Sequence, residues 1–290
     1  MTDAKLAGLE ERTAEIKGVR MRYFVGGTGP PLVLVHGLGG AASNWAELAP
    51  LLARRHRLLV PDLPGHGGSS ALPAVSGLEP YADRVALVAE REGLLPALVV
   101  GHSLGGMVVL RLALRRPDDV TAIVLAGAAG LSIGNVFGRQ LLSLFTAVRP
   151  GRIAAKHRGW IARSPRLRKL VFGFVSVADP ASLSNDAVEG FLAAQLLHTD
   201  VDGAWQALRV DDPRRELEAI HCPVLVLWGA EDVQLPLDDA FEYARRLHAR
   251  LRVIPGCGHL LMGERPDACE RAIEDFYATA ASKGTTSPPD

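Results

Sequence analysis

The sequence lacks the long apolar runs that would place it across a membrane. No stretch of about 18 uncharged apolar residues occurs, so we expect no membrane-spanning helix. Residues 1–18 mix charged and apolar side chains and contain no apolar segment like that of a signal peptide, so we do not expect export by that route.

Cysteine is scarce, with Cys222, Cys257 and Cys269 as the three. They show neither the spacing of metal ligands nor the even number typical of a disulfide framework, which fits the reducing cytoplasm. The sequence therefore suggests no metal and no cofactor. Cys257 lies two residues before His259 and is a candidate nucleophile on that ground, but a serine described below has the stronger context.

An excess of charge of one sign is also missing, because 32 Lys and Arg residues balance 32 Asp and Glu residues. Without a global field we do not expect nucleic acid or an anionic membrane surface as a partner. One local basic cluster consists of Arg163, Arg166, Arg168 and Lys169. We interpret it as a solvated helix face, with an anionic-ligand site as the alternative.

What the chain does have is the composition of a folded globular domain. Its 290 residues are 48% hydrophobic and 22% charged, which suits one large core with an insertion. Short apolar runs that end in glycine or polar turns predict buried parallel strands over residues 31–35, 57–60, 97–100, 121–125, 224–228 and 250–254. Amphipathic stretches predict helices over residues 45–55, 79–92, 104–116, 238–248 and 266–281. This alternation predicts an α/β fold with a mostly parallel sheet flanked by helices.

The pattern changes between residues 131 and 212, where helical periodicity continues but no convincing buried strand occurs. We interpret this stretch as a helical insertion between two parts of the core, 1–130 and 213–281. The polar, proline-rich residues 282–290 are expected to form a frayed tail. Helical pieces of the insertion are predicted over residues 136–146, 153–161, 167–174 and 185–197, with prolines at 150, 165 and 180 between them.

The strongest chemical signal is Gly101-His102-Ser103-Leu104-Gly105, a G-x-S-x-G sequence between a predicted strand and a predicted helix. A serine on such a tight turn has a strained backbone, and glycines on both sides let neighbouring chain segments approach closely. The turn presents the hydroxyl at the carboxyl edge of the sheet. Ser103 is therefore the candidate nucleophile. We expect His102 to pack beneath the turn rather than to transfer protons.

A serine hydroxyl needs a histidine as base and a carboxylate to orient that histidine, in the chain order serine, acid, histidine. Asp232 follows the strand predicted over 224–228, and its neighbour Glu231 is the alternative acid. His259 follows the strand predicted over 250–254, in a glycine-rich loop. These positions predict a Ser103, Asp232 and His259 triad.

Acyl transfer also needs hydrogen-bond donors for the developing oxyanion. The backbone amide of Leu104 begins a helix and is one candidate. The other is expected in the glycine-rich loop after the strand over 31–35, where Leu38 is the first choice and Gly39 the alternative. A phosphate-binding loop is disfavoured, because neither G-K-[ST] nor G-x-G-x-x-G spacing occurs there. We expect a second glycine-rich turn, residues 62–69, to be architectural.

With these motifs in place, residues 20–281 resemble an α/β-hydrolase with a helical cap. The resemblance rests on the following motifs: His36-Gly37, Asp62-Leu63-Pro64-Gly65-His66-Gly67, the Gly-His-Ser-Leu-Gly-Gly turn from Gly101, Gly229-Ala230-Glu231-Asp232 and Gly258-His259. It implies that residues 131–212 form the cap and shape an acyl pocket. Aromatic and apolar cap residues are candidate pocket linings, with simple cap packing as the alternative: Phe137, Leu141, Phe145, Trp160, Phe172, Phe174, Phe191 and Leu197.

The resemblance also narrows the chemistry. Relatives that open epoxides or displace halide carry aspartate where this chain has Ser103. Haloperoxidases without cofactor carry threonine, and proline iminopeptidases tryptophan, where this chain has Leu104. What remains is a carboxylesterase or lactonase acting on a small-molecule ester or lactone. A C–C bond hydrolase of meta-cleavage products is the alternative, although such enzymes typically have tryptophan soon after the histidine. A non-catalytic binding protein is a third hypothesis. The sequence leaves the oligomeric state open.

Overall fold

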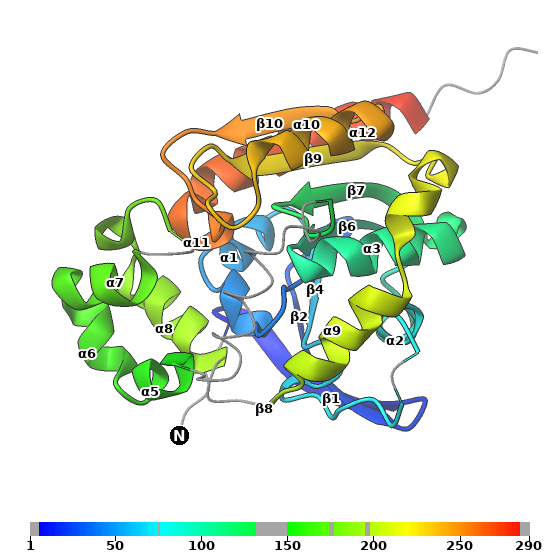
Figure 1. Cartoon of the computed structure of the whole chain (residues 1–290). Helices are drawn as coiled ribbons and strands as arrows, with labels where there is room; N and C mark the ends of the chain where they lie inside the picture. The colour runs from blue at the N-terminus through cyan, green and yellow to red at the C-terminus, as the bar shows by residue number, and fades with distance from the viewer. Residues whose placement is uncertain (1–5, 75, 132–149, 174–176, 195–197, 285–290) are drawn as a thin grey trace, which may run out of the picture.

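The computed structural model describes residues 6–74, 76–131, 150–173, 177–194 and 198–284, and its centre is an eight-stranded sheet (Figure 1). The strands are β1 (Leu9–Ile16), β2 (Val19–Gly26), β3 (Pro31–Val35), β4 (Arg57–Pro61), β6 (Ala97–His102), β7 (Val120–Ala126), β9 (Val224–Gly229) and β10 (Arg250–Ile254). Their order is β1-β2-β4-β3-β6-β7-β9-β10, and the six strands from β4 to β10 in that order are parallel. The six predicted strands and the mostly parallel sheet are confirmed.

Strands β1 and β2 were not expected from the sequence. They form an antiparallel hairpin at one edge of the sheet, and β2 also pairs antiparallel with β4. Four of the eight residues in β1 are charged, so a search for uncharged runs missed this partly exposed edge strand. The turn Lys17-Gly18 has positive φ at both residues, which is the usual two-residue hairpin connection.

Helices cover both faces of the sheet. Four of the five helices predicted in the core are confirmed to within three residues at each end: α2 (Glu79–Arg91), α3 (Leu104–Arg115), α10 (Leu237–Arg246) and α12 (Pro266–Gly284). The helix expected over 45–55 was wrong, because only the short η1 (Ala42–Trp45) and α1 (Ala49–Leu52) form there. Residues 282–284, expected to belong to a frayed tail, are part of α12, which ends at Gly284. Residues 285–290 lie outside the described part of the chain.

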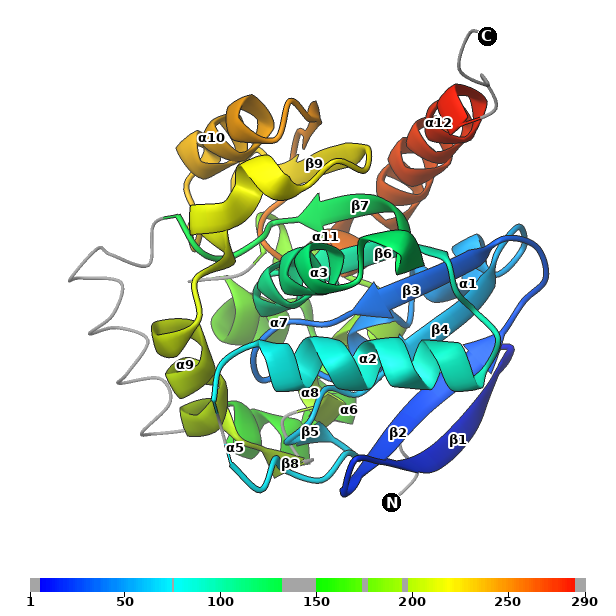
Figure 2. The same cartoon turned by 90° about the vertical axis from the view of Figure 1, so that its right-hand side faces the viewer.

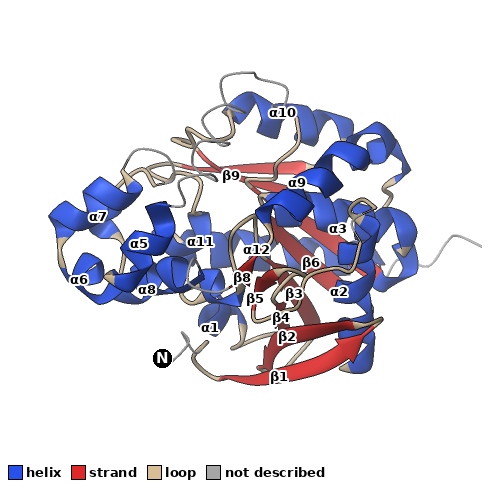
Figure 3. Cartoon of the chain, turned by 60° about the horizontal axis from the view of Figure 1, so that its bottom comes forward, coloured by secondary structure: helices blue, strands red, loops and turns tan. Residues whose placement is uncertain are grey.

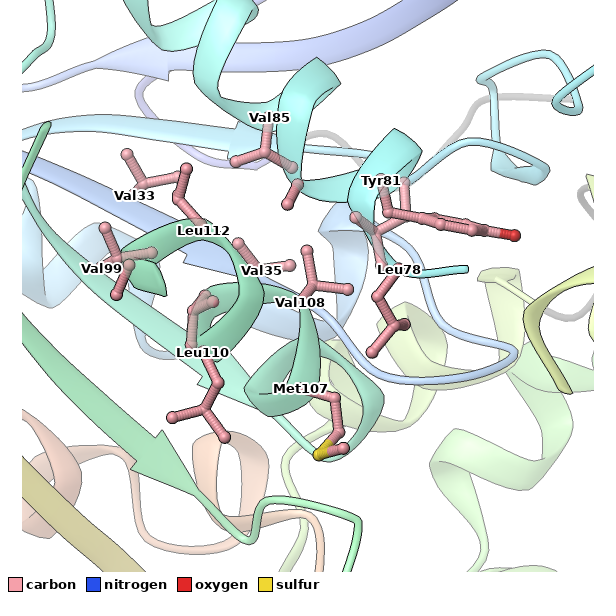
Figure 4. Close-up of a cluster of buried hydrophobic side chains, with 14 of the residues drawn as sticks. Val33, Val35, Leu78, Tyr81, Val85, Val99, Met107, Val108, Leu110 and Leu112 are labelled. Carbon is pink, nitrogen blue, oxygen red and sulfur yellow. The ribbon is translucent and has the colours of Figure 1, made fainter. Parts of the chain in front are cut away.

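Alternate residues of the parallel strands supply two separate cores. Val33 and Val99 point to the face where α2 and α3 lie side by side, and they pack with Val85 and Val108 of these helices (Figures 2 and 4). Leu32 and its neighbours on the other face pack with α1 and α12. A central strand buried on both faces must be apolar at every position, which explains the continuous runs in the sequence.

Between β7 and β9 the structure describes mostly helices: α5 (Pro150–Lys156), α6 (Arg158–Arg163), α7 (Pro165–Phe172), α8 (Asn185–Ala194) and α9 (Val201–Val210). The piece expected over 153–161 is split into α5 and α6, and the piece expected over 136–146 lies outside the described residues. A two-residue strand, β8 (His198–Thr199), pairs with β5 (His66–Gly67), which corrects the expectation of no strand here. Helices α5 to α8 group at one end of the molecule, beyond the sheet (Figures 1 and 3).

Two buried histidines join the loops that follow β3 and β4. The Leu63 amide donates to His36 Nε2 at 3.0 Å, so the proton of that ring is on Nδ1, which donates to the Gly37 carbonyl at 2.8 Å. His66 lies 5.4 Å from His36 between ring centroids, and its Nδ1 contacts the Pro64 carbonyl oxygen at 3.0 Å. Burial lowers the pKa of each histidine to about 4, so both rings are neutral at pH 7.

A buried carboxylate fixes the far end of the same loop. Asp62 Oδ1 accepts from the Ala42 amide at 2.6 Å, and Oδ2 accepts from the Gly68 amide at 2.8 Å and from Arg22 at 3.3 Å. Arg22 also forms a two-pronged ion pair with Glu11. The segment from His36 to Ala42 is therefore held at both ends by the turn over 62–69, in line with the architectural role expected for that turn.

We predict that the free energy of unfolding falls as the pH drops from 7 to 5. The unfolded chain protonates His36 and His66 near their ordinary pKa of 6.5, whereas the folded protein does not until about pH 4. Stability from these groups is complete above pH 6.5 and is lost on acidification, by about 2 kcal/mol per histidine at pH 5. Urea denaturation at both pH values measures it. His66→Asn, whose amide replaces Nδ1, should reduce the difference by about 2 kcal/mol, the share of this one histidine; an unchanged difference would contradict the assignment.

Candidate active site

Ser103 occupies the sharp turn between β6 and α3. Its backbone has φ 53° and ψ −118°, a strained conformation for a residue with a side chain. A Cβ atom on Gly101 would lie 2.4 Å from the Gly105 carbonyl oxygen, and one on Gly105 would lie 2.3 Å from the Val35 carbonyl oxygen. The glycines of the motif are therefore required by close packing of the turn against itself and against β3.

Backbone hydrogen bonds fix this turn against the end of β7. The Ser103 amide donates to the Ala126 carbonyl at 3.1 Å, and the Ala129 amide donates to the Ser103 carbonyl at 3.0 Å. The strain at Ser103 is thus balanced by bonds on both sides, and the serine is presented where β6 and β7 end.

His259 and Asp232 meet although 27 positions separate them in the chain. His259 Nδ1 lies 2.8 Å from Asp232 Oδ2, and the Asp232 side chain is 1% exposed. Oδ1 of the same carboxylate accepts from the Gln234 and Leu235 amides, both at 2.9 Å. These two bonds orient the carboxylate, and an ionised carboxylate can only accept, so Nδ1 of His259 donates and Nε2 is left as the basic atom.

Glu231 has a different partner. Its Oε2 accepts from the Cys257 amide at 2.7 Å, and the Glu231 amide donates to the Cys257 carbonyl at 2.9 Å. The residue is exposed, but its carboxylate ties the loop after β9 to the loop after β10. Of the two adjacent acids, Asp232 is the one that contacts His259.

His102 supports His259 from below. Its ring lies 4.7 Å from the His259 ring between centroids, and its Nε2 contacts the His259 carbonyl oxygen at 2.9 Å. Burial holds the pKa of His102 well below its usual range, so the ring is neutral and Nε2 is the donor. Because His102 directly precedes Ser103, this contact brings the serine turn and the histidine loop together.

Cys257 does not have the properties of a nucleophile. Its side chain is buried, and burial raises the pKa of the thiol far above its ordinary value. The nearby Glu264 acts in the same direction. The thiolate that a cysteine nucleophile requires is therefore disfavoured at neutral pH.

A buried carboxylate that sequence reasoning missed holds the histidine loop. Both oxygens of Glu264 lie 3.0 Å from the Gly258 amide, and Oε2 also accepts from the Ala178 amide at 2.8 Å. Glu264 is the last residue of α11 (Leu261–Glu264) and is 6% exposed. Burial raises the pKa of its carboxyl, and the hydrogen bonds from Gly258 and Ala178 act against that rise. Glu264 thus links the residue before His259 to Ala178, in the loop that precedes η3 (Pro180–Ser182).

The two expected oxyanion donors lie next to this site. Leu104 is the first residue of α3, so its amide has no acceptor within the helix. Leu38 lies in a turn closed by the Gly40 amide and the Gly37 carbonyl at 3.1 Å, and this turn requires the positive φ of Gly39. A Cβ atom on Gly37 would lie 2.9 Å from Ser103 Cβ, so the turn packs directly against the serine.

Of the residues expected to line an acyl pocket, two are buried, one is exposed and five lie outside the described part of the chain. Phe172 and Phe191 are buried and lie 6.4 Å apart between ring centroids, which is also what simple packing would give. Trp160 is 75% exposed, which does not fit a pocket lining. The other candidates lie outside the described residues: Phe137, Leu141, Phe145, Phe174 and Leu197.

The basic cluster is not one solvated face, because Arg168 is buried. Its Nε donates to the Ala162 carbonyl at 2.8 Å, and its Nη2 donates to Asn185 at 2.6 Å. Arg168 therefore joins α6 and α7 to the start of α8. The other three members are exposed: Arg163, Arg166 and Lys169.

Ser103, Asp232 and His259 follow the carboxyl ends of the parallel strands β6, β9 and β10. This arrangement on a mostly parallel sheet defines an α/β protein of the hydrolase class. Comparison with known proteins agrees: the chain belongs to the α/β-hydrolase family, whose model, described as alpha/beta hydrolase fold, matches residues 30–266. No helix in the described part of the chain is long and apolar enough to cross a bilayer.

Several curated proteins are similar along most of their length. A pimeloyl-[acyl-carrier protein] methyl ester esterase from Aromatoleum aromaticum is 34% identical over 85% of this chain and 97% of its own. A dihydrolipoyllysine-residue acetyltransferase component of an acetoin cleaving system from Pseudomonas putida is 32% identical over 93% of this chain and 70% of its own. A 2-hydroxy-6-oxo-6-phenylhexa-2,4-dienoate hydrolase from Burkholderia cepacia is 26% identical over 96% and 97%.

We predict that Glu264→Ala loosens the loop that carries His259. The substitution leaves the Gly258 and Ala178 amides without their acceptor, and an unsatisfied buried donor costs about 1–3 kcal/mol. Hydrogen–deuterium exchange should therefore accelerate in the peptides that contain these two amides.

Glu264→Gln keeps one carbonyl oxygen and should show a smaller increase in exchange at both places. Glu231→Gln is the matched control, because it retains an acceptor for the Cys257 amide. Equal exchange in wild type and Glu264→Ala would show that the carboxylate does not hold the loop.

Proposed function

We propose that the protein hydrolyses a carboxylic ester or lactone through an acyl-enzyme formed on Ser103. The observation that carries the proposal is the 2.8 Å contact between His259 Nδ1 and Asp232 Oδ2, together with a serine on a strained strand-to-helix turn. This contact leaves His259 Nε2 available as a base. His102, the residue before Ser103, contacts the carbonyl oxygen and the ring of His259, which supports a reaction in which this base activates the serine for attack on a carbonyl.

In the proposed reaction, His259 Nε2 takes the proton of Ser103 Oγ while Oγ attacks the carbonyl carbon. The Leu38 and Leu104 amides stabilise the oxyanion of the tetrahedral intermediate. The intermediate collapses, the alcohol oxygen receives the proton from His259, and the acyl group stays on Ser103. Water then enters, His259 takes one of its protons, and the same steps release the acid. Asp232 holds the histidine in the Nδ1–H tautomer and stabilises the imidazolium.

We assign residues 131–212 as a cap over this site and a small-molecule ester or lactone as the substrate. The esterase relative, 34% identical, supports this substrate class. The three cysteines are unpaired, which fits a location in the reducing cytoplasm. The 26% identical dienoate hydrolase favours C–C bond hydrolysis as a second candidate. Turnover of a coloured dienoate ketone, with no turnover of p-nitrophenyl esters or lactones, would favour that candidate.

Ser103→Ala should abolish ester turnover with little effect on thermal unfolding, because the half-buried side chain lies at a turn and not in the core. The loss should approach the roughly 10⁶-fold scale of triad knockouts. A fluorophosphonate probe should label wild type, and peptide mapping should find the adduct on Ser103. His259→Ala should suppress the labelling. Retention of more than about a tenth of the activity in Ser103→Ala, or an adduct on Cys257, would exclude this nucleophile.

Asp232→Asn should lower kcat by about 10² to 10⁴, because the amide favours the wrong tautomer of His259. Glu231→Gln is the matched control, since it changes the adjacent acid but keeps an oxygen for the Cys257 amide, and it should be nearly silent. Both kcat values are measured on one activated ester. A large loss of kcat in Glu231→Gln, with kcat of Asp232→Asn unchanged, would assign the acid role to Glu231 instead.

A further inference from the structure

Positive charge is concentrated in the three helices α5, α6 and α7. Residues 150–172 contain seven Lys and Arg residues and no Asp or Glu, although the whole chain is neutral. Four of these basic residues are exposed: Lys156, Arg163, Arg166 and Lys169. A local field of this kind attracts an anionic partner even when the net charge of the protein is zero.

The same helices expose large apolar side chains. Ile153 is 66% exposed, Trp160 75% and Leu170 66%, one on each helix. With Leu167 they make four of the seven exposed large hydrophobic residues in the described part of the chain. Single exposed apolar residues are normal on a protein surface, but a concentration of them marks an interaction site.

Each of the three apolar side chains points away from the protein. Every one lies two positions from a buried residue of its own helix, namely Ile153 from Ala155, Trp160 from Ala162 and Leu170 from Phe172. Two positions correspond to about 200° around a helix, so these side chains lie opposite the buried ones. The inner sides of α5 and α6 contact α8, and the three helices lie at one end of the molecule (Figures 1 and 3).

We propose that this tip surface, formed by the exposed basic and apolar residues of α5–α7, docks the protein on an anionic lipid bilayer. Tryptophan and aliphatic side chains among lysines and arginines match a membrane interface, where acyl chains lie beneath negative headgroups. A second copy of this chain is a poorer occupant, because a two-fold contact would bring the four exposed basic residues against the same four. Docking here is peripheral and requires no spanning helix.

Vesicle binding tests the proposal without any use of enzyme activity, so its outcome is independent of the proposed hydrolysis. Vesicles of phosphatidylcholine with about a third phosphatidylglycerol are compared with phosphatidylcholine alone. Trp45 and Trp228 are buried and Trp205 is half-buried, so Trp160 is the most exposed of the four tryptophans. We expect binding to the anionic vesicles only, with a blue shift of tryptophan emission that Trp160→Phe reduces.

Substitutions then separate the electrostatic contribution to vesicle binding from the apolar one. Arg166→Gln with Lys169→Gln should weaken binding by roughly 25-fold, at about fivefold per charge. The pair Trp160→Ser and Leu170→Ser should weaken it by at least about tenfold. Phe241→Ser removes a 52% exposed side chain of α10, away from the tip, and should bind like wild type.

Equal binding to both kinds of vesicle would overturn the proposal, and so would unchanged binding of both tip variants. Absence of vesicle binding, together with a dimer in light scattering that Trp160→Ser dissociates, would show that the surface joins two copies of the chain instead. Salt at about 0.5 M should release the wild type, because screening at that concentration acts within a few ångströms.

Discussion

The site depends on one hydrogen bond, from His259 Nδ1 to Asp232 Oδ2, and much of the surrounding structure holds its two partners still. The amides of Gln234 and Leu235 bind Oδ1 of Asp232 and orient the carboxylate. Its second oxygen, Oδ2, is the one that contacts His259. The carbonyl oxygen of His259 accepts a hydrogen bond from Nε2 of His102. In the proposed mechanism His259 is the base, which requires one fixed tautomer. The Asp232 carboxylate that fixes this tautomer is itself held by two backbone amides.

The loops around this bond have few side chains of their own to keep them in place. Glycines surround His259, and such a backbone is free to adopt many conformations. Two carboxylates compensate: Glu231 binds the Cys257 amide, and Glu264 binds the Gly258 amide. On the opposite side of the serine, Asp62 and His36 do the same for the loop that carries Leu38. Side-chain acceptors thus replace the hydrogen bonds that regular secondary structure would provide.

The sequence predicted the parallel strands and most of the long helices, and it predicted that Ser103, Asp232 and His259 follow strands, here β6, β9 and β10, because each of these features has a local signal. Buried strands read as apolar runs, and the turn around Ser103 needs its glycines. It did not predict the charged edge hairpin of β1 and β2, since one half of an edge strand faces water. Nor did it predict that Arg168 is buried or that Glu264 bonds the histidine loop. A charged residue of this kind carries no local pattern, and its role depends on backbone groups far away in the chain.

The central claim is that an acyl group passes through Ser103. Rapid quenching during turnover of a p-nitrophenyl ester, followed by mass spectrometry of the digested protein, tests it directly. The account predicts a burst of p-nitrophenol close to one equivalent of enzyme when deacylation is slow, and a peptide containing Ser103 that is heavier by the mass of the acyl group. Acylation of another residue would contradict this claim. So would full turnover of a slowly hydrolysed ester during which the peptide containing Ser103 stays unmodified in the presteady state.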